Sequence, residues 1–376
     1  MHLTLLFTYG VSIKDWHKSG LLEREILIYK ELKKKYDLQI QFITFGDKSD
    51  KEFEESLDGI TIIPVYEKIK RPKSRLIRFF KTFLMIWVYR NDLVKTNLVK
   101  TNQQWGSWLA LLIKKVYSKP LILRSGYNNL NYIDSKIIKL ISFISLKLSY
   151  KYSDQIHVSS ESDKKSILSK FKVKDNKIIF RQNWIDTNSF TSHSKKRNDR
   201  ILFVGRLSKE KNIPLLLDAL KGTQLGLDII GDGNEKNTIT DVINNFNLDI
   251  KFLGNKSNNE MPTFYNKYSI FVLCSTREGN PKALLEAMSC EMAVIGTDVI
   301  GINEIIINNY NGILINSNPA ELRSAMIKLH KNPTLQNELG SNARKTIIKN
   351  NAFDKILSIE YLNYKELHEK NKNSIS

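Results

Sequence analysis

Two glutamates, Glu278 and Glu286, lie eight positions apart in the stretch STREGNPKALLE. The apolar run before it, Ile270 to Cys274, predicts a buried strand. The Gly-Asn-Pro turn and the helix formers after it predict a helix that begins near Pro281, with Asn280 as its N-cap. Glu278 would then lie in a strand-to-helix loop at the carboxyl edge of a parallel sheet, where ligands bind and free helix amides favour an anion. The alternative is that both glutamates are solvated helix-end charges.

A second pair of candidate groups, Arg206 and Lys211, follows another predicted strand in the segment VGRLSKEKN. Both would lie at the same sheet edge as the Glu278 loop. A guanidinium and an ammonium beside a helix N-terminus suit a diphosphate, whose negative charge increases as it leaves. Each cation alone is more simply explained as a surface charge, so it is the combination that indicates a diphosphate site.

Composition limits the class of protein. The 376 residues exceed what one hydrophobic core usually supports, so two domains are expected. The two cysteines, Cys274 and Cys290, have neither disulfide nor metal-ligand spacing, which fits a reduced cytoplasmic setting. The N-terminal MHLTLLFTYG lacks the features of a signal peptide and indicates a core strand. No segment reaches about 18 uninterrupted apolar residues, so no membrane span is expected.

The net charge of +19 is concentrated in the first half of the chain. From Lys68 to Arg124 there are 14 basic residues and a single acid, Asp92, which indicates an anionic partner. The predicted helix from Lys73 to Tyr89 mixes cations with Leu, Phe and Trp, a pattern that suits an anionic membrane surface. It equally suits a helix whose apolar face covers the sheet. Nucleic acid is not expected as the partner, because no recognised binding motif accompanies the charge.

Apolar strands alternate with amphipathic helices, which predicts parallel α/β sheets. The polar segment Thr191 to Arg200 predicts a linker between two such sheets. Before it, strands are expected near 2–7, 38–45, 61–65, 98–102, 120–124 and 155–159, and helices near 20–35, 73–89, 107–117, 134–150 and 161–169. After it, strands are expected near 200–205, 227–231, 250–253, 270–274, 292–297 and 312–315, with helices near 213–220, from 281, from 319 and near 353–370.

Two local features need separate treatment. The segment Gly10 to Gly20 is expected as a loop at a carboxyl edge, either binding a polar substrate or serving as a plain connection. The tandem repeat LVKTN-LVKTN, Leu93 to Asn102, cannot continue one strand in equivalent facing, because its shift is five residues. The second copy is assigned to a strand and the first to an inserted loop.

Six stretches of the second half match a known family in order and spacing: FVGRLSKEKN, IIGDGNE, FLGNKS, STREGNPKALLEAMSCEMAVIGTD, GINEII and NGILI. They cover most of Ile201 to Ile315, which resembles the donor domain of retaining GT-B glycosyltransferases of glycosyltransferase family 4. The first half matches less specifically, through GVSIKDWHKSGLLEREI, HVSSESDKKSIL and RQNWIDTNSF. The resemblance implies an α/β GT-B fold, with two Rossmann-like parallel-sheet domains facing across a cleft. Residues 1–190 would bind the acceptor and residues 191–352 the nucleotide-sugar, and a helix in 353–376 would cross back to the N-terminal domain.

The resemblance also implies roles for single residues. Arg206 and Lys211 would bind the nucleotide diphosphate, and Glu278 would hold the donor sugar. Glu286 would accept hydrogen bonds from the ribose hydroxyls. The implied catalytic residues are therefore Glu278, Arg206 and Lys211, and the implied donor-binding residues are Gly10, Gly231, Gly233, Gly279, Asn280, Pro281, Lys282, Ala283, Glu286 and Glu304.

The sequence departs from the family pattern in two places. Many members place a histidine or an aspartate in the loop that corresponds to RSGYNN, Arg124 to Asn129, and this loop has neither. No histidine is therefore assigned a catalytic role. The GxxE motif has Ile300 where another glycine is usual, so Glu304 is the weakest of the assignments.

The implied chemistry is sugar transfer from a UDP-, GDP- or similar nucleotide-sugar to a glycan or lipid-linked acceptor, with retention at the anomeric carbon. A covalent carboxylate intermediate and front-face attack both remain open. No D-x-D motif occurs, which agrees with fixed cations in place of a metal, so neither metal nor cofactor is expected. The expected setting is cytoplasmic, at the inner face of the membrane, in cell-surface polysaccharide or glycolipid synthesis. The alternatives are a GT-B nucleotide-sugar epimerase and a non-catalytic basic nucleic-acid-binding protein.

Overall fold

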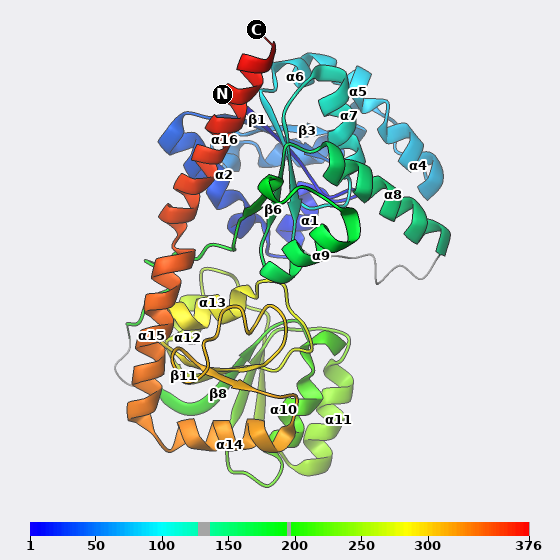
Figure 1. The fold of residues 1–376 in the computed structure, drawn as a ribbon. Coiled ribbons are helices and arrows are strands. Elements are labelled where there is room, and N and C mark those ends of the chain that lie inside the picture. The colour runs from blue at the N-terminus through cyan, green and yellow to red at the C-terminus, as the bar shows by residue number, and fades with distance from the viewer. Residues whose placement is uncertain (127–135, 194–196, 376) are drawn as a thin grey trace. The chain divides into compact units, whose positions relative to one another are not determined.

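The structure is a computed structural model that describes residues 1–126, 136–193 and 197–375 (Figure 1). Contacts divide the chain into two compact units: unit 1 is Met1–Arg181 with Leu357–Ser376, and unit 2 is Gln182–Ile356. The domain boundaries expected from the sequence are 190/191 and 352/353.

Cys274 and Cys290 are buried free thiols, and burial raises the pKa of each to about 12.

Unit 1 contains a seven-stranded parallel sheet in the order β3-β2-β1-β4-β5-β6-β7. Every residue of β4 and β6 is buried, as expected for strands covered on both faces. The six strands predicted in this half are confirmed, and β7 was not predicted, because three residues carry too short a pattern. The strands are β1 (His2–Leu6), β2 (Gln39–Thr44), β3 (Thr61–Pro64), β4 (Leu98–Thr101), β5 (Leu121–Ser125), β6 (Gln155–Val158) and β7 (Ile178–Phe180).

The helices of unit 1 agree with the predicted ones over 20–35, 107–117, 134–150 and 161–169, to within a few residues at their ends. The helices are α1 (Ile13–Lys18), α2 (Leu22–Tyr36), α3 (Val65–Lys68), α4 (Arg75–Thr82), α5 (Met85–Val88), α6 (Arg90–Lys95), α7 (Ser107–Tyr117), α8 (Lys136–Tyr152), α9 (Glu161–Phe171) and α16 (Phe353–Ile375), most of which lies in this unit.

The segment predicted as a loop from Gly10 to Gly20 contains the short helix α1. Its N-cap is Ser12, whose hydroxyl accepts the Asp15 N–H at 3.1 Å, while the Asp15 carboxylate accepts the Ser12 N–H at 2.8 Å. This reciprocal capping box satisfies amides that would otherwise be free. The polar groups that suggested a substrate-binding loop are therefore partly used to begin a helix.

The predicted helix from Lys73 to Tyr89 is broken into α4 and α5. Thr82, the last residue of α4, is fully buried, and its hydroxyl donates a hydrogen bond to the Phe79 carbonyl at 2.6 Å. A threonine that bonds back to a carbonyl of the preceding turn competes with the helix hydrogen bonds and bends the helix. The spacing of apolar side chains in the sequence does not predict this break.

The first copy of the LVKTN repeat is helical, so its prediction as a loop is wrong. Leu93 to Lys95 end α6, whereas the second copy forms β4 as predicted. Leu93 is buried, and the hydroxyl of Thr96 bonds that of Thr4 at 2.6 Å. The same five letters thus take two conformations, because each copy meets different neighbours.

Unit 2 contains a six-stranded parallel sheet in the order β10-β9-β8-β11-β12-β13, and all six strands were predicted. Every residue of β9 and β12 is buried, so both sheet faces are covered. The strand order reverses at the neighbours β8 and β11. The strands are β8 (Asn198–Val204), β9 (Leu227–Ile230), β10 (Ile250–Gly254), β11 (Tyr268–Leu273), β12 (Ala293–Thr297) and β13 (Ile313–Ile315).

The helices of unit 2 include two that were not predicted, α11 and α12. The start of α14 follows the sequence signal, because Asn318 accepts the Ala320 N–H at 2.8 Å and Pro319 takes the first helical position. The helices are α10 (Ile213–Leu220), α11 (Lys236–Phe246), α12 (Met261–Tyr265), α13 (Lys282–Ser289), α14 (Pro319–His330) and α15 (Pro333–Asn351).

The terminal helix α16 returns to unit 1, as the family resemblance implied. Its fully buried carboxylate, Glu360, forms ion pairs with Lys100 of β4 and with Arg181, and hydrogen-bonds Tyr364 one turn further along. Burial alone would raise the pKa of the Glu360 carboxyl, but Arg181 and Lys100 hold that pKa well below its usual range. Burial in turn lowers the pKa of Lys100 to about 8. The helix is also held by Tyr361, which stacks on Tyr36 with ring centroids 3.9 Å apart.

We expect Glu360→Gln to loosen α16, because it leaves Lys100 and Arg181 buried without their counter-charge. Breaking a buried pair by removing one partner typically costs about 3–5 kcal/mol. Hydrogen–deuterium exchange in α16 measures the change. Glu366→Gln is the matched control, because Glu366 lies on the same helix in an exposed pair with Lys370, which is worth less than about 1 kcal/mol. Equal exchange in the two variants would contradict the role of Glu360.

Candidate active site

The predicted site residues of unit 2 follow four adjacent strands, β9, β8, β11 and β12, at their carboxyl ends. Lys211 follows β8 and Glu278 follows β11, the two neighbours at which the strand order reverses. In open α/β sheets this switch point forms the crevice in which ligands bind. The topology therefore places the predicted residues at the sheet edge where open sheets of this kind bind ligands.

Lys211 and Glu278 contact each other directly. The Lys211 ammonium donates to Glu278 Oε1 at 2.5 Å, and the Ser275 hydroxyl donates to the same oxygen at 2.6 Å. The side chains of Lys211 and Glu278 are 21% and 13% exposed, so the pair is shielded but reachable. One carboxylate and one ammonium thus share a partly buried position at the sheet edge.

Backbone contacts fix the loop that carries Glu278. The Glu278 N–H donates to the Ile300 carbonyl at 3.1 Å, and the Thr276 N–H donates to the Glu210 carbonyl at 2.8 Å. Gly301 has φ +86°, and a Cβ there would lie 2.4 Å from the Glu278 carbonyl oxygen. The loops after β8, β11 and β12 are therefore packed against one another by their backbones, and a side chain at residue 301 would force them apart.

Gly231 and Gly233 follow β9 and permit an equally close approach. Gly231 has φ +138°, and a Cβ there would lie 2.0 Å from the Gly205 carbonyl oxygen. A Cβ on Gly233 would lie 2.3 Å from the carbonyl oxygen of Leu207. Both glycines are thus required by the loop after β8, which carries Arg206 and Lys211. Their expected approach to a nucleotide remains a prediction.

The helix of the opening sequence motif, α13, begins at Lys282, one residue later than predicted. Pro281 is its N-cap, so the prediction of Asn280 as N-cap is wrong. The Asn280 side chain instead accepts the Asn183 N–H at 3.0 Å, which withdraws it from the helix. The Lys282 ammonium lies over the Trp184 ring, 5.0 Å from its centroid. The first turn of α13 includes Ala283 and begins three residues after Gly279.

Glu286 lies one turn into α13 and is 7% exposed. Its Oε2 accepts a hydrogen bond from the Tyr265 hydroxyl of α12 at 2.9 Å. This bond holds the carboxylate in one orientation. The alternative of a solvated helix-end charge is therefore wrong for Glu286, and Glu278 is likewise mostly buried.

Three further predicted residues are exposed. Arg206 is exposed on the loop after β8, and Glu304 is exposed in the turn after β12. Gly10 lies in unit 1 at the end of β1, with φ +85° and open space around the position of a Cβ. Half of the loop RSGYNN, from Tyr127 onward, lies outside the described residues.

Four residues that shape this site were not predicted from the sequence. Ser275 had a signal, because a serine three positions before a glutamate often hydrogen-bonds to it. Gly301 belongs to the motif GINEII, in which the sequence pattern indicates a role for the glutamate but not for the glycine. Asn183 and Tyr265 carry no local signal, since they are far in sequence from the residues they contact.

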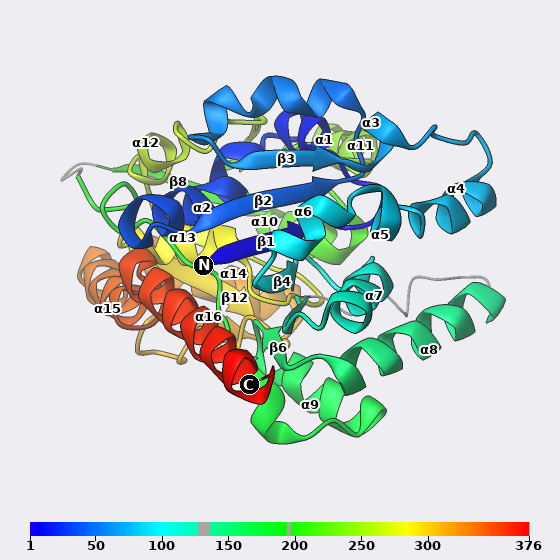
Figure 2. The same ribbon diagram turned by 90° about the horizontal axis from the view of Figure 1, so that it is seen from above.

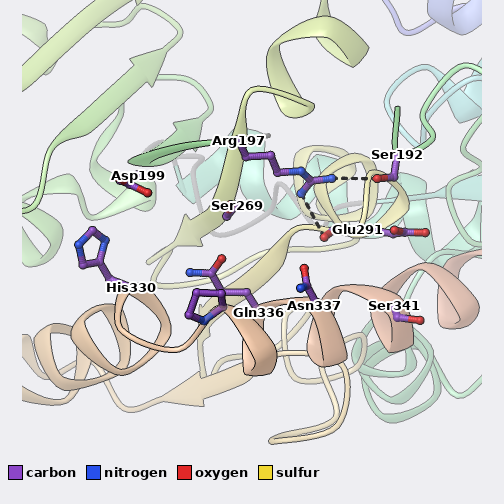
Figure 3. A pocket seen from close by; sticks show the side chains of 10 residues that line it. Ser192, Arg197, Asp199, Ser269, Glu291, His330, Gln336, Asn337 and Ser341 are labelled. Carbon is purple, nitrogen blue, oxygen red and sulfur yellow. Dashed lines mark hydrogen bonds between the residues drawn. The ribbon is translucent and has the colours of Figure 1, made fainter. Parts of the chain in front are cut away.

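A separate cavity of about 680 Å³ lies elsewhere in unit 2 (Figure 3). Its lining includes Asp199 and Ser269, which are near the amino ends of β8 and β11, at the opposite sheet edge. The Arg197 guanidinium in it already donates to the carbonyls of Tyr268 at 3.1 Å and Cys290 at 2.6 Å. None of the predicted site residues lines this cavity, so it is not the candidate site.

Comparison with known proteins decides the class of this chain. Residues 185–346 match the family model described as Glycosyl transferases group 1. The chain is a glycosyltransferase. This glycosyltransferase has two parallel-sheet Rossmann-like units, and the predicted GT-B fold is confirmed by its likeness to solved structures.

Individual relatives of this glycosyltransferase differ in coverage. An uncharacterized glycosyltransferase of Methanocaldococcus jannaschii is 36% identical over 146 residues, which are 38% of this chain and 42% of that protein. A Campylobacter jejuni α-1,4-N-acetyl-D-galactosaminyltransferase, whose name includes a PP-undecaprenol-linked glycan, is 26% identical over 299 residues, 77% of this chain and 78% of that protein. The structure of HepE from Anabaena in complex with UDP has a TM-score of 0.79 at 16% identity, covering 97% of this chain and all of that one.

We expect Gly301→Ala to displace the Glu278 loop and to lower kcat/KM for sugar transfer roughly 10²-fold, because small displacements of positioning groups have such effects. Gly222→Ala is the matched control, since Gly222 has a similar φ of +71° but nothing near the position of a Cβ. Transfer rates and thermal midpoints of both variants separate backbone strain from the specific clash. If Gly301→Ala retained the activity of Gly222→Ala, the clash would be irrelevant to the site.

Proposed function

We propose that this chain is a retaining glycosyltransferase of family 4 that transfers a sugar from a nucleotide-diphospho-sugar to a glycan or lipid-linked acceptor. The observation that carries the proposal is the Lys211–Glu278 pair at the switch point of the unit 2 sheet, next to the start of α13. The cation proposed for the diphosphate, Lys211, and the carboxylate proposed for the sugar, Glu278, are then in direct contact. This arrangement suits a donor in which phosphate and sugar are joined by the bond that breaks.

In this proposal Arg206, Lys211 and the first turn of α13 stabilise the leaving diphosphate. The exposed Arg206 guanidinium is available to a phosphate, and Lys211 can exchange the Glu278 carboxylate for a phosphate oxygen. A cation held in a shielded position, as Lys211 is, stabilises developing charge without reorganising water. We propose that these groups act in place of a metal, consistent with the missing D-x-D motif.

Glu278 is proposed to bind hydroxyl groups of the donor sugar, and Glu286 to bind the ribose. Each carboxylate already has an orienting hydroxyl, from Ser275 and Tyr265 respectively. A carboxylate held in this way accepts hydrogen bonds from two vicinal hydroxyls with little loss of entropy. The two carboxylates, oriented in this way, are the proposed acceptors of these hydrogen bonds.

The donor and acceptor classes rest on similar proteins. HepE has been crystallised with UDP, with UDP and glucose, and with UDP-glucose, which supports a UDP-sugar among the UDP-, GDP- and similar donors. Two Campylobacter jejuni relatives carry undecaprenol-linked substrates in their names, which supports a lipid-linked acceptor. We propose that the chain acts in cell-surface polysaccharide or glycolipid synthesis, in the cytoplasm at the inner face of the membrane.

We expect a screen of UDP-, GDP- and ADP-sugars to identify one donor class whose nucleoside diphosphate is released. Lys211→Met should lower kcat/KM for that donor roughly 10²-fold, because losing one such electrostatic donor typically costs about 3 kcal/mol. Lys209→Met is the matched control, since Lys209 is an exposed lysine on the same short turn. Its rate should stay within twofold of the wild type.

Product analysis decides between the proposal and its alternatives. Retention requires the new glycosidic bond to keep the anomeric configuration of the donor, as measured by NMR of the product. Conversion of labelled donor without any acceptor would indicate an epimerase instead. Failure to bind any nucleotide-sugar, with tight salt-sensitive binding to nucleic acid, would contradict the whole proposal.

A further inference from the structure

Helix α8 of unit 1 exposes several of its large apolar side chains and buries two of its serines. Leu140, Ile144 and Leu148 are 60%, 49% and 44% exposed, whereas Ser142 and Ser149 are 4% and 0% exposed. A helix on a water-facing surface has the opposite arrangement. The buried hydroxyl of Ser149 has no hydrogen-bond partner within the part of the chain that the structure describes. This helix therefore packs on unit 1 through Leu146, Tyr150 and its buried serines, while other leucines and isoleucines face outward.

The segment α4–α5 has the same property. Leu76, Phe80 and Trp87 are 67%, 62% and 63% exposed. Met85 and Ile86 are fully buried, so the segment does cover part of unit 1, but with a different set of side chains. One set of side chains in this segment therefore covers unit 1, and a different set leaves its outward face apolar.

These two segments hold more than half of the exposed large apolar side chains of the described residues and lie on the same side of unit 1 (Figure 1, Figure 2). Of the 20 large hydrophobic side chains that are exposed among the described residues, 11 belong to α4, α5, α8 and the residues between α4 and α5. α4 and α8 project from the same side of unit 1 in both views, and Figure 2 shows α7 between them. Exposed apolar side chains concentrated in this way mark a surface that binds a protein or a membrane.

The charge of the region selects its partner. Around α4 and α5, from Lys68 to Arg90, the sequence has eight basic residues and no acid. α8 has four lysines and no acid over 136–152, and Lys139, Lys147 and Lys151 are exposed. A second copy of this chain would present the same positive charge and be repelled. An anionic lipid surface provides both the apolar interior and the negative head groups.

We infer that α4–α5 and α8 form a two-helix docking surface that inserts side chains into the acyl boundary of an anionic bilayer. No helix within the described residues is long and apolar enough to cross a membrane, so the contact lies in the plane of the interface. The two helices follow the carboxyl ends of β3 and β5, the edge at which this sheet would bind a ligand. The biological role of this docking rests on the lipid-linked acceptor of the proposed function. The docking itself can be measured without donor or acceptor.

Co-sedimentation of the full chain with vesicles of phosphatidylglycerol and phosphatidylcholine tests the inference. We expect Leu140→Gln with Ile144→Gln on α8, and separately Phe80→Gln with Trp87→Gln on α4–α5, each to lower the partition coefficient about tenfold or more, since each removes two inserting side chains. Leu362→Gln is the matched control, because Leu362 is also 60% exposed in unit 1 but lies on α16. It should bind vesicles as the wild type does.

Lipids brominated on their acyl chains should quench Trp87 fluorescence in the wild type, and the quenching should be lost in Trp87→Phe. All substituted side chains are exposed, so circular dichroism should show unchanged folding. Vesicle binding of the α8 variant equal to that of the wild type would overturn the inference, as would a dimer that the same substitutions dissociate. Donor turnover in solution, unchanged in these variants, separates failure of docking from failure of the proposed activity.

Discussion

The contact between Lys211 and Glu278 crosses the point at which the strand order of the unit 2 sheet reverses. Parallel strands on either side of such a point send their following loops in opposite directions, so a crevice opens at the carboxyl edge. An ammonium from one side and a carboxylate from the other meet there, both mostly shielded from water. The pair links the two loops, and its charged groups can exchange each other for the groups of a charged, hydroxylated donor.

The rest of the site depends on backbone contacts that leave no room for side chains. Gly231 and Gly233 let the loop after β9 touch the loop that carries Lys211, and Gly301 lets the turn after β12 touch the loop that carries Glu278. Because all of these loops are fixed at their backbones, the cation and the carboxylate are positioned before any ligand binds. Such preorganisation is the main source of electrostatic stabilisation in enzymes.

The parallel sheets and their strands could be predicted from the sequence, because buried runs such as Ile270 to Cys274 leave a strong apolar signal. Features that depend on tertiary neighbours could not. The two LVKTN copies differ only in what they contact, and Thr82 interrupts a helix that its side-chain pattern continues. Within the site, the loop and the two glutamates followed from local spacing, but the hydroxyls of Ser275 and Tyr265 that orient them became visible only in three dimensions. Asn280 shows the same limit. It is a good N-cap residue, but its side chain accepts a hydrogen bond from Asn183, which is distant in sequence, instead of capping α13.

The central claim is that Lys211 serves the diphosphate and Glu278 serves the sugar, and a pair of affinities tests this division most directly. Titration calorimetry would compare the intact donor with its nucleoside diphosphate in the wild type and in Glu278→Ala. The account predicts that Glu278→Ala weakens the intact donor at least about tenfold, in line with a lost hydrogen bond to a charged group. The nucleoside diphosphate should bind as tightly as in the wild type or more tightly, because Lys211 is released. An equal loss for both ligands, or no loss for the intact donor, would contradict the division of roles.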